Sequence, residues 1–334
     1  MNETTTLARP GTGRTRSSVK DRLWSPQMLL LGVLVLLCAV FTAADSESFA
    51  NAMNWRNILL DVSVLTVLAV GATLILAMAD FDLSIGSVLV LSGVVSALTM
   101  SALGDSAGSL LLGLVVGVLT GAACGAASGI VVARFGVPSI IVTLGMLGVA
   151  QGIALLLTNG VDVRNVPRSL VMGLGNGNAF SNIPWLAVIA AVIAIVIGMM
   201  LRHTVFGRNT IAIGSSLEAL RRSGTSVVAQ KIAVFALAGA LYGLAGYLSL
   251  ARFSTTTIAG HGSDMLDAYT AVILGGNSPF GGMGSVLGSV IGVFIPVVLR
   301  NGFVIVDVQP FWQQIVVGTI LVAAVYLHRA RRRG

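Results

Sequence analysis

The sequence of 334 residues is poor in the side chains from which most catalytic sites are built. It contains two cysteines, three histidines and two lysines. Neither lysine (Lys20 or Lys231) follows a glycine, so the chain has no GxxxxGK[S/T] loop with which to bind a nucleotide. No GxSxG motif is present, and the histidines are too scattered to show a metal-ligand spacing. We therefore predict that the chain has no catalytic residues, no metal site and no cofactor of its own.

Charged residues are also scarce, at 10% against about 25% in soluble domains. Apolar residues make up 55%, and apolar runs of 18 or more residues recur, which indicates membrane-spanning helices. Cys38 and Cys124 both lie inside such runs, so we interpret them as packing residues and expect no disulfide framework. We predict an all-α polytopic membrane protein with about ten spanning helices. The predicted spans are 27–44, 58–79, 83–101, 110–133, 138–158, 183–202, 231–252, 265–276, 284–302 and 311–328.

The net charge of +7 comes from clusters beside the spans and not from one face. Basic residues gather in the N-terminal tail (1–26), in the loop 203–230 and in the C-terminal tail (329–334). An even number of predicted spans precedes the loop and an even number follows it, so all three clusters lie on one side. The positive-inside rule makes that side cytoplasmic. We predict a disordered cytoplasmic tail at 1–26, a membrane domain at 27–328 and a basic cytoplasmic tail at 329–334; binding of the tails to anionic lipid is an alternative.

Two interruptions divide the chain into weakly repeated halves. The segment 74–89 aligns without gaps with 272–287, and both break an apolar stretch, near 80–84 and 275–284. Paired interruptions point to broken helices that line a path through the membrane. The span 265–276 is short at about 1.5 Å per residue, so it is expected to be a half-helix or a re-entrant segment.

Polar side chains within the interruptions are candidates for the translocation pathway, because charged groups at membrane depth usually face a cavity or a partner. These candidates are Asp80, Asp82, Ser84, Asn277 and Ser278. The alternative for Asp82 is that it caps a helix beginning at Leu83.

One span carries a glycine at every fourth position. This period places the glycines on a single helix face, where a neighbouring helix can approach closely. We predict a helix-packing role for Gly113, Gly117, Gly121, Gly125 and Gly129.

The basic loop 203–230 contains the signals of a short helix. Ser215 and Glu218 have the spacing of a capping box, in which each side chain bonds the other residue's amide. Arg221 and Arg222 suit the last turn, and Gly224 stands where a C-terminal stop is expected. A helix this short is marginal in water, so it needs a surface to dock against.

Three segments resemble the ribose-type sugar permeases of bacterial ABC importers. They are AVGATLILAMADFDLSIGSVLVLSG (69–93), SLEALRRSGTSVVAQKI (216–232) and LDAYTAVILGGNSPFGGMGSVLGSVIGV (266–293). The resemblance implies an inner-membrane permease that passes a monosaccharide, pairs with a cytoplasmic ATPase that binds ATP and Mg, and receives sugar from an extracytoplasmic binding protein. It also implies two permease subunits, usually a homodimer, although a heterodimer is open. The expected pathway is uncharged and lined by Ser, Thr and Asn.

The same resemblance gives the basic loop its partner, since in such importers a short cytoplasmic helix docks into a groove of the ATPase. Leu217 and Leu220 would supply apolar contact, and Arg221 and Arg222 would meet acidic or polar groups. The residues expected to couple to the ATPase are Ser215, Leu217, Glu218, Ala219, Leu220, Arg221, Arg222 and Gly224. A helix lying on lipid headgroups is the alternative.

Two other classes of transporter remain open. Related ABC permeases carry nucleosides or branched-chain amino acids. An ion-coupled secondary transporter would also use repeats and broken helices, but it would need buried ionisable residues to carry its coupling ion.

Overall fold

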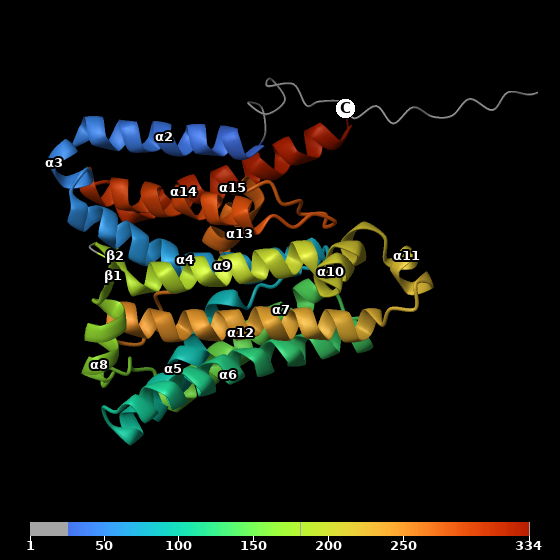
Figure 1. Cartoon of the computed structure of the whole chain (residues 1–334), viewed down its shortest axis with the longest axis horizontal. Helices are drawn as coiled ribbons and strands as arrows, with labels where there is room; N and C mark the ends of the chain where they lie inside the picture. The colour runs from blue at the N-terminus through green and yellow to red at the C-terminus, as the bar shows by residue number, and fades with distance from the viewer. Residues whose placement is uncertain (1–25, 181, 334) are drawn as a thin grey trace, which may run out of the picture.

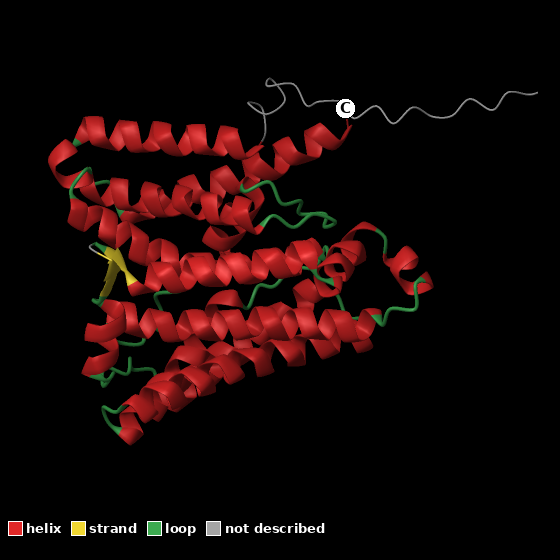
Figure 2. Cartoon of the chain, viewed as in Figure 1, coloured by secondary structure: helices red, strands yellow, loops and turns green. Residues whose placement is uncertain are grey.

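The computed structural model describes residues 26–180 and 182–333, and nearly all of this chain is helical (Figures 1 and 2). The predicted tail 1–26 lies almost wholly outside the described residues. The helices are α2 (Pro26–Ala44), α3 (Ser46–Phe49), α4 (Ala52–Ala77), α5 (Ile85–Leu103), α6 (Ala107–Arg134), α7 (Ser139–Thr158), α8 (Arg168–Leu170), the π-helix η1 (Val171–Gly175), α9 (Trp185–His203), α10 (Val205–Ser215), α11 (Leu217–Arg222), α12 (Val227–Phe253), α13 (Asp264–Leu274), α14 (Val286–Ile305) and α15 (Pro310–Arg333). Within the described residues the only strands are β1 (Asn178–Phe180) and β2 (Ile183–Pro184), which pair antiparallel.

Each of the ten predicted spans corresponds to one of these helices. By length and apolar composition, seven described helices can cross a membrane, namely α4, α5, α6, α7, α9, α12 and α14. Helices α2 and α15 contain shorter apolar stretches, Leu30–Ala44 and Phe311–Tyr326. Helix α13 has 11 residues, so at about 1.5 Å per residue it covers roughly half of a bilayer core, as expected of a half-helix. The prediction of an all-α polytopic membrane protein is confirmed.

The long helices run side by side along the longest axis of the molecule (Figure 1). Helix α11 projects at one end of this bundle, which we call the α11 end. Helices α3 and α8 and the β-hairpin lie at the opposite end (Figures 1 and 2). Helices α4, α5 and α12 are mostly buried and form the centre, whereas α6, α7 and α9 expose most of their apolar surface, as helices facing lipid do.

The glycine stripe of α6 faces the centre of the bundle. A Cβ atom on Gly121 would lie 2.1 Å from the carbonyl oxygen of Gly239, and one on Gly239 would lie 2.2 Å from that of Gly121. Gly125 and Gly129 meet α12 in the same way, and Gly113 and Gly117 approach Ser96 and Met100 of α5. Because dispersion contacts must hold helices together where lipid replaces water, this close backbone approach joins α6 to α12 and α5.

Five elements have no counterpart among the predicted ones: α3, α8, α10, η1 and the β-hairpin. Each contains 11 or fewer residues. Such lengths give little hydrophobic periodicity to recognise.

We expect Gly121→Ala to destabilise the chain by about 1–3 kcal/mol, because the added methyl group overpacks the contact with α12. The matched control is Gly148→Ala in the middle of α7, where a Cβ atom meets nothing within 4 Å. Thermal unfolding of the detergent-solubilised chain measures both, and equal midpoints for the two variants would contradict the packing role.

Candidate functional site

Helix α11 begins one residue later than the predicted capping box requires. Ser216 is its N-cap and accepts the Ala219 N–H at 3.4 Å, so the prediction of Ser215 as the cap is wrong. The reason is that α10 continues through Ser215, whose hydroxyl donates to the Ala212 carbonyl at 3.3 Å. Glu218 does not reach back to the cap and instead pairs with Arg222 at 2.6 Å. Both side chains are more than three-quarters exposed, so this pair adds little stability.

The residues of α11 divide into an anchored side and an exposed side. Leu220 is buried against its own chain, which leaves it unavailable as the partner contact assigned to it from the sequence. Leu217 is half-buried, whereas Glu218, Ala219, Arg221 and Arg222 are exposed. Gly224 ends the segment at φ +79°, and a Cβ there would meet nothing within 4 Å. Helix α11 is therefore fixed to the bundle by Leu220 and presents a mixed-charge surface outward.

The end of α10 touches both predicted interruptions. A Cβ on Gly214 would lie 2.1 Å from the Ala77 carbonyl oxygen and 2.5 Å from the Gly282 amide nitrogen. The Gly282 amide itself donates to the Ala77 carbonyl at 3.0 Å. Three segments distant in sequence thus meet at one point, where only a residue without a side chain fits.

An ion pair ties the start of α12 to the first interruption. The Lys231 Nζ lies 2.7 Å from the Asp80 Oδ2, and the two side chains are only 18% and 11% exposed. Lys231 lies in the second turn of α12, just after the loop that carries α11. The loop is therefore held against the interruptions on both sides of α11, by the close contact at Gly214 before it and by the ion pair of Lys231 after it.

The first interruption, residues 78–84, is organised by Asp82. Its carboxylate accepts from the Ser84 amide at 2.8 Å and from the Ser84 hydroxyl at 2.6 Å. The expected helix start at Leu83 is wrong, because α5 begins at Ile85 and its N-cap is Ser84. The Asp82 amide donates to the Tyr269 hydroxyl at 2.6 Å, which fastens this interruption to α13.

The second interruption, residues 275–285, is organised by Asn277. Its Nδ2 donates to the Val272 carbonyl and the Ser289 hydroxyl, both at 2.9 Å, and its Oδ1 accepts from the Ser285 amide at 2.6 Å. The Ser278 hydroxyl accepts from the Phe280 amide at 3.2 Å. Both side chains are fully buried and bond their own segment of the chain.

The sequence-derived pathway residues thus lie together around the interruptions, and their pathway role stays a prediction. The interactions that the structure shows for Asp80, Asp82, Ser84, Asn277 and Ser278 are all with the chain itself. None of the five lines the cavity described next.

A polar cavity of about 480 Å³ lies among α4, α12, α13 and α14, toward the opposite end from α11. Sequence reasoning missed it and expected an uncharged pathway. Its ionisable side chains are Asp61, Arg252, His261, Asp264, Asp267 and Arg300. Four of these stand inside predicted spans, and an ionisable residue at such a position is a sequence signal for a functional site. Among the described residues, no three His, Cys, Asp or Glu side chains are grouped to hold a metal ion.

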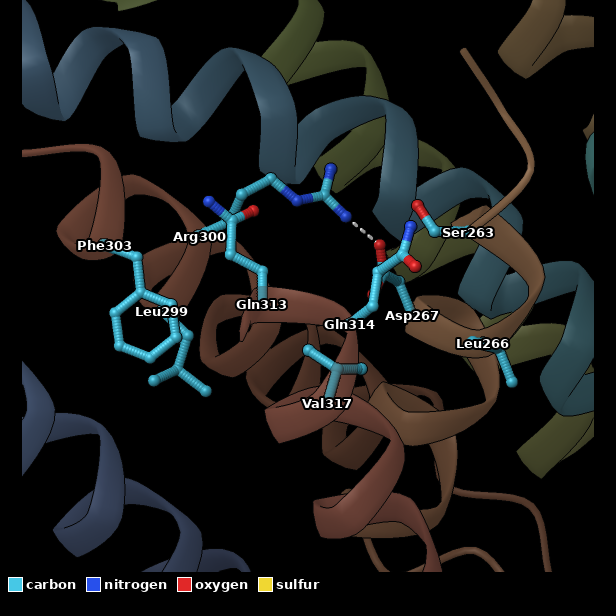
Figure 3. A pocket seen from close by; sticks show the side chains of 9 residues that line it. All are labelled: Ser263, Leu266, Asp267, Leu299, Arg300, Phe303, Gln313, Gln314 and Val317. Carbon is cyan, nitrogen blue, oxygen red and sulfur yellow. Dashed lines mark hydrogen bonds and ion pairs between the residues drawn. The ribbon is translucent and has the colours of Figure 1, made fainter. Parts of the chain in front are cut away.

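The cavity's charges are paired across elements. Asp61 of α4 bonds Arg252 of α12 at 3.2 Å, and Asp264 bonds His261 at 2.6 Å. Asp267 of α13 bonds Arg300 of α14, and this pair also borders a smaller cavity of about 130 Å³ beside α15 (Figure 3). Pairing offsets the high cost of charge in a membrane domain.

We expect Lys231→Met to lower the free energy of unfolding by about 3 kcal/mol, because it leaves the Asp80 carboxylate with no cation in a mostly buried site. The double variant Asp80→Asn/Lys231→Met removes both charges and should recover most of the loss. Chemical or thermal unfolding in detergent measures both variants. A double variant as unstable as the single one would show that the pairing is not what stabilises this contact.

Comparisons with known proteins identify the family to which the chain belongs. Residues 54–325 match the family model described as "Branched-chain amino acid transport system / permease component". The chain is 33% identical over 330 residues to the L-arabinose transport system permease protein of Escherichia coli K12, covering 97% of this chain and 96% of the relative. It is 35% identical over 316 residues to the ribose import permease protein of the same strain, covering 92% and 94%.

The xylose transport system permease protein of Escherichia coli K12 is 31% identical over 364 residues, with 91% of this chain and 92% of the relative covered. No solved structure matches the chain significantly. The family match extends from the first turn of α4 to within α15, so it includes both interruptions, α11 and the polar cavity. The chain belongs to this family of permease components, and the three relatives compared above are permeases named for the transport of L-arabinose, ribose and xylose.

Proposed function

We propose that this chain is the membrane permease subunit through which an ATP-driven importer passes a monosaccharide. The support is the near-full-length similarity to permeases named for arabinose, ribose and xylose, three neutral pentoses. A binding protein outside the cell hands the sugar to the opposite end of the bundle. The chain lies in the bacterial inner membrane, with the α11 end and both termini on the cytoplasmic side.

The partner ATPase, which binds ATP and Mg, docks on α11. The observation that carries this proposal is the division of α11 into an anchored side and an exposed side. Glu218, Ala219, Arg221 and Arg222 present charge and backbone to a partner, while Leu220 holds the helix to the bundle. A helix of 6 residues that projects from the bundle in this way gains stability from a groove that receives it.

The contacts around α11 define a route for force. A displacement of α11 pulls on α10 at one side and on α12 at the other. Helix α10 reaches Ala77 and Gly282 through Gly214, and α12 reaches Asp80 through Lys231. Both interruptions therefore respond to the same movement, and in this way ATPase closure switches the pathway between its outward- and inward-facing states. A second permease subunit, a homodimer partner, completes the assembly.

A second candidate substrate follows from the description of the matching family, which names branched-chain amino acids. The paired carboxylates and guanidinium groups of the cavity have the charges that an amino acid zwitterion requires. The three sugar-permease relatives favour a sugar, and a transport assay separates the two candidates.

The test of the proposed function is uptake by proteoliposomes that contain the permease, the ATPase and the binding protein encoded with it. We expect the vesicles to accumulate labelled L-arabinose, D-ribose or D-xylose only when ATP is present in the lumen, on the same side of the membrane as the ATPase. Accumulation of leucine alone would replace sugar by amino acid. Uptake by the permease alone, driven by a proton or sodium gradient, would contradict the ABC mechanism.

Replacement of Gly224 tests the docking of α11 and separates two reasons for glycine. Its positive φ is strained for a β-branched residue but tolerated by Asn. We expect Gly224→Val to weaken ATPase co-purification about tenfold or more and to abolish uptake, while membrane insertion is unchanged. Gly224→Asn should retain binding if backbone conformation is the requirement, and lose it if the ATPase needs the space. Uptake by the Gly224→Val variant equal to that of the unmodified protein would show that Gly224 is not part of the docking site.

A further inference from the structure

The polar cavity has the form of a small-ligand site inside a single permease subunit. Its volume of about 480 Å³ falls within the range of roughly 300–1,000 Å³ that ligand pockets occupy. It is lined by side chains of α4, α12, α13, α14 and the loop 254–263. Residues more than 190 positions apart in sequence meet across it, since Asp61 bonds Arg252. All of the wall residues named here belong to this one chain.

The charged groups of the walls retain unused hydrogen-bonding capacity. A guanidinium has five N–H donors and a carboxylate has about four acceptor positions. Within the described chain, Arg252 makes one side-chain hydrogen bond, from Nε to Asp61, and Arg300 makes one, to Asp267. Asp61 is 43% and Arg300 46% exposed at the side chain, and both line the cavity. The remaining donors and acceptors are available to a molecule in it.

The acidic and basic side chains of the walls indicate which chemical class of molecule fits the cavity. Three carboxylates share the cavity with two guanidinium groups and one imidazole, so the numbers of acidic and basic groups are similar and donors and acceptors are both present. Each acid–base pair sets an acceptor beside a donor. Adjacent hydroxyl groups, which both donate and accept, match this arrangement better than an apolar solute does.

An aromatic ring at the cavity wall adds an apolar surface. Phe253 is 46% exposed and lines the cavity, and the Arg252 guanidinium carbon lies 5.8 Å from its ring centroid. A sugar ring has one face of C–H groups and an edge of hydroxyls. Phe253 thus offers a surface for such a C–H face, and the adjacent Asp61 and Arg252 offer partners for hydroxyls.

Toward the α11 end, the space between α4 and α12 closes. Tyr242, fully buried, lies against Gly71, where a Cβ would be 2.6 Å from the tyrosine ring. Tyr242 precedes Arg252 by ten positions, which is about 15 Å along α12. Its hydroxyl has no hydrogen-bond partner within the described chain. The contact between Tyr242 and Gly71 thus separates the cavity from the two interruptions.

We propose that this cavity is a monosaccharide-binding subsite of the permease, in which the Asp61–Arg252 pair holds hydroxyl groups and Phe253 packs against the sugar ring. The inference rests on the proposed function and deepens it, because it gives the permease a substrate contact of its own. The site would accept sugar from the binding protein before the interruptions open.

The experiment measures sugar binding to the purified full-length permease without ATPase or binding protein. Saturation-transfer NMR with L-arabinose, D-ribose and D-xylose reports weak binding, and L-leucine serves as the zwitterionic probe. For the double variant Asp61→Asn/Arg252→Gln we expect the half-saturating sugar concentration to rise about tenfold, the effect of losing one charge-assisted hydrogen bond. The matched control, Asp105→Asn/Arg168→Gln, makes the same changes outside the cavity and should leave binding unaltered.

A second variant guards against misfolding of the first. Phe253→Ala removes only the half-exposed ring and should also weaken sugar binding, while the thermal unfolding midpoint of the chain stays close to that of the unmodified protein. No saturable binding of any of the three sugars, or equal binding by both double variants, would overturn the subsite. Saturation by leucine in place of sugar would also overturn it.

Uptake by the complete assembly distinguishes the two failures. If ATP-driven sugar uptake persists while the permease alone binds no sugar, the subsite is wrong and the proposed function stands. If the assembly takes up none of the sugars, the proposed function itself fails.

Discussion

Two breaks in helical backbone inside a membrane domain are the constraint on which this structure depends. A helix satisfies its own N–H and C=O groups, whereas an interrupted segment must find partners elsewhere, and each unsatisfied group in hydrocarbon costs several kcal/mol. The chain supplies those partners both from distant elements and from the break itself. The Tyr269 hydroxyl accepts from the Asp82 amide, and the Ala77 carbonyl accepts from the Gly282 amide. The Asn277 side chain bonds Val272, Ser285 and Ser289 around its own break.

The same contacts link the two breaks to the basic loop. Part of the backbone at each break is held by groups on other helices, since the Asp82 amide bonds Tyr269 of α13 and the Gly282 amide bonds Ala77 of α4. Gly214 and Lys231, on either side of α11, are the points of attachment. Tight packing between α6 and α12 holds the far side of α12, so under the proposed function a movement of α11 would be directed to the breaks.

Sequence reasoning succeeded where local composition determines the outcome. Spans are set by apolar length, and a glycine period of four, as at Gly117 and Gly121, places a close contact on one helix face. It failed where two neighbours compete for one role, as when Ser215 and Ser216 could each cap α11. It also failed where tertiary packing decides, since nothing local shows that Leu220 turns toward its own chain.

The polar cavity could not be assembled from the sequence for a related reason. Asp61 and Arg252 each stand alone in an apolar span, and only the fold brings them within 3.2 Å. The expectation of an uncharged pathway followed from counting charges along the chain. In the folded molecule, however, the few ionisable residues of the spans come together around one cavity. The chain therefore carries few charges in total, but this cavity has many.

The central claim is that movement at α11 reaches the interruptions, and distances between spin labels test it most directly. With Cys38 and Cys124 replaced by alanine, Arg221→Cys and Met283→Cys would each be paired with a reference label at Leu111→Cys on the exposed face of α6. Double electron–electron resonance would compare the permease–ATPase assembly without nucleotide and trapped with ATP. We predict that both distances change together. A change at Arg221 with no change at Met283 would contradict it.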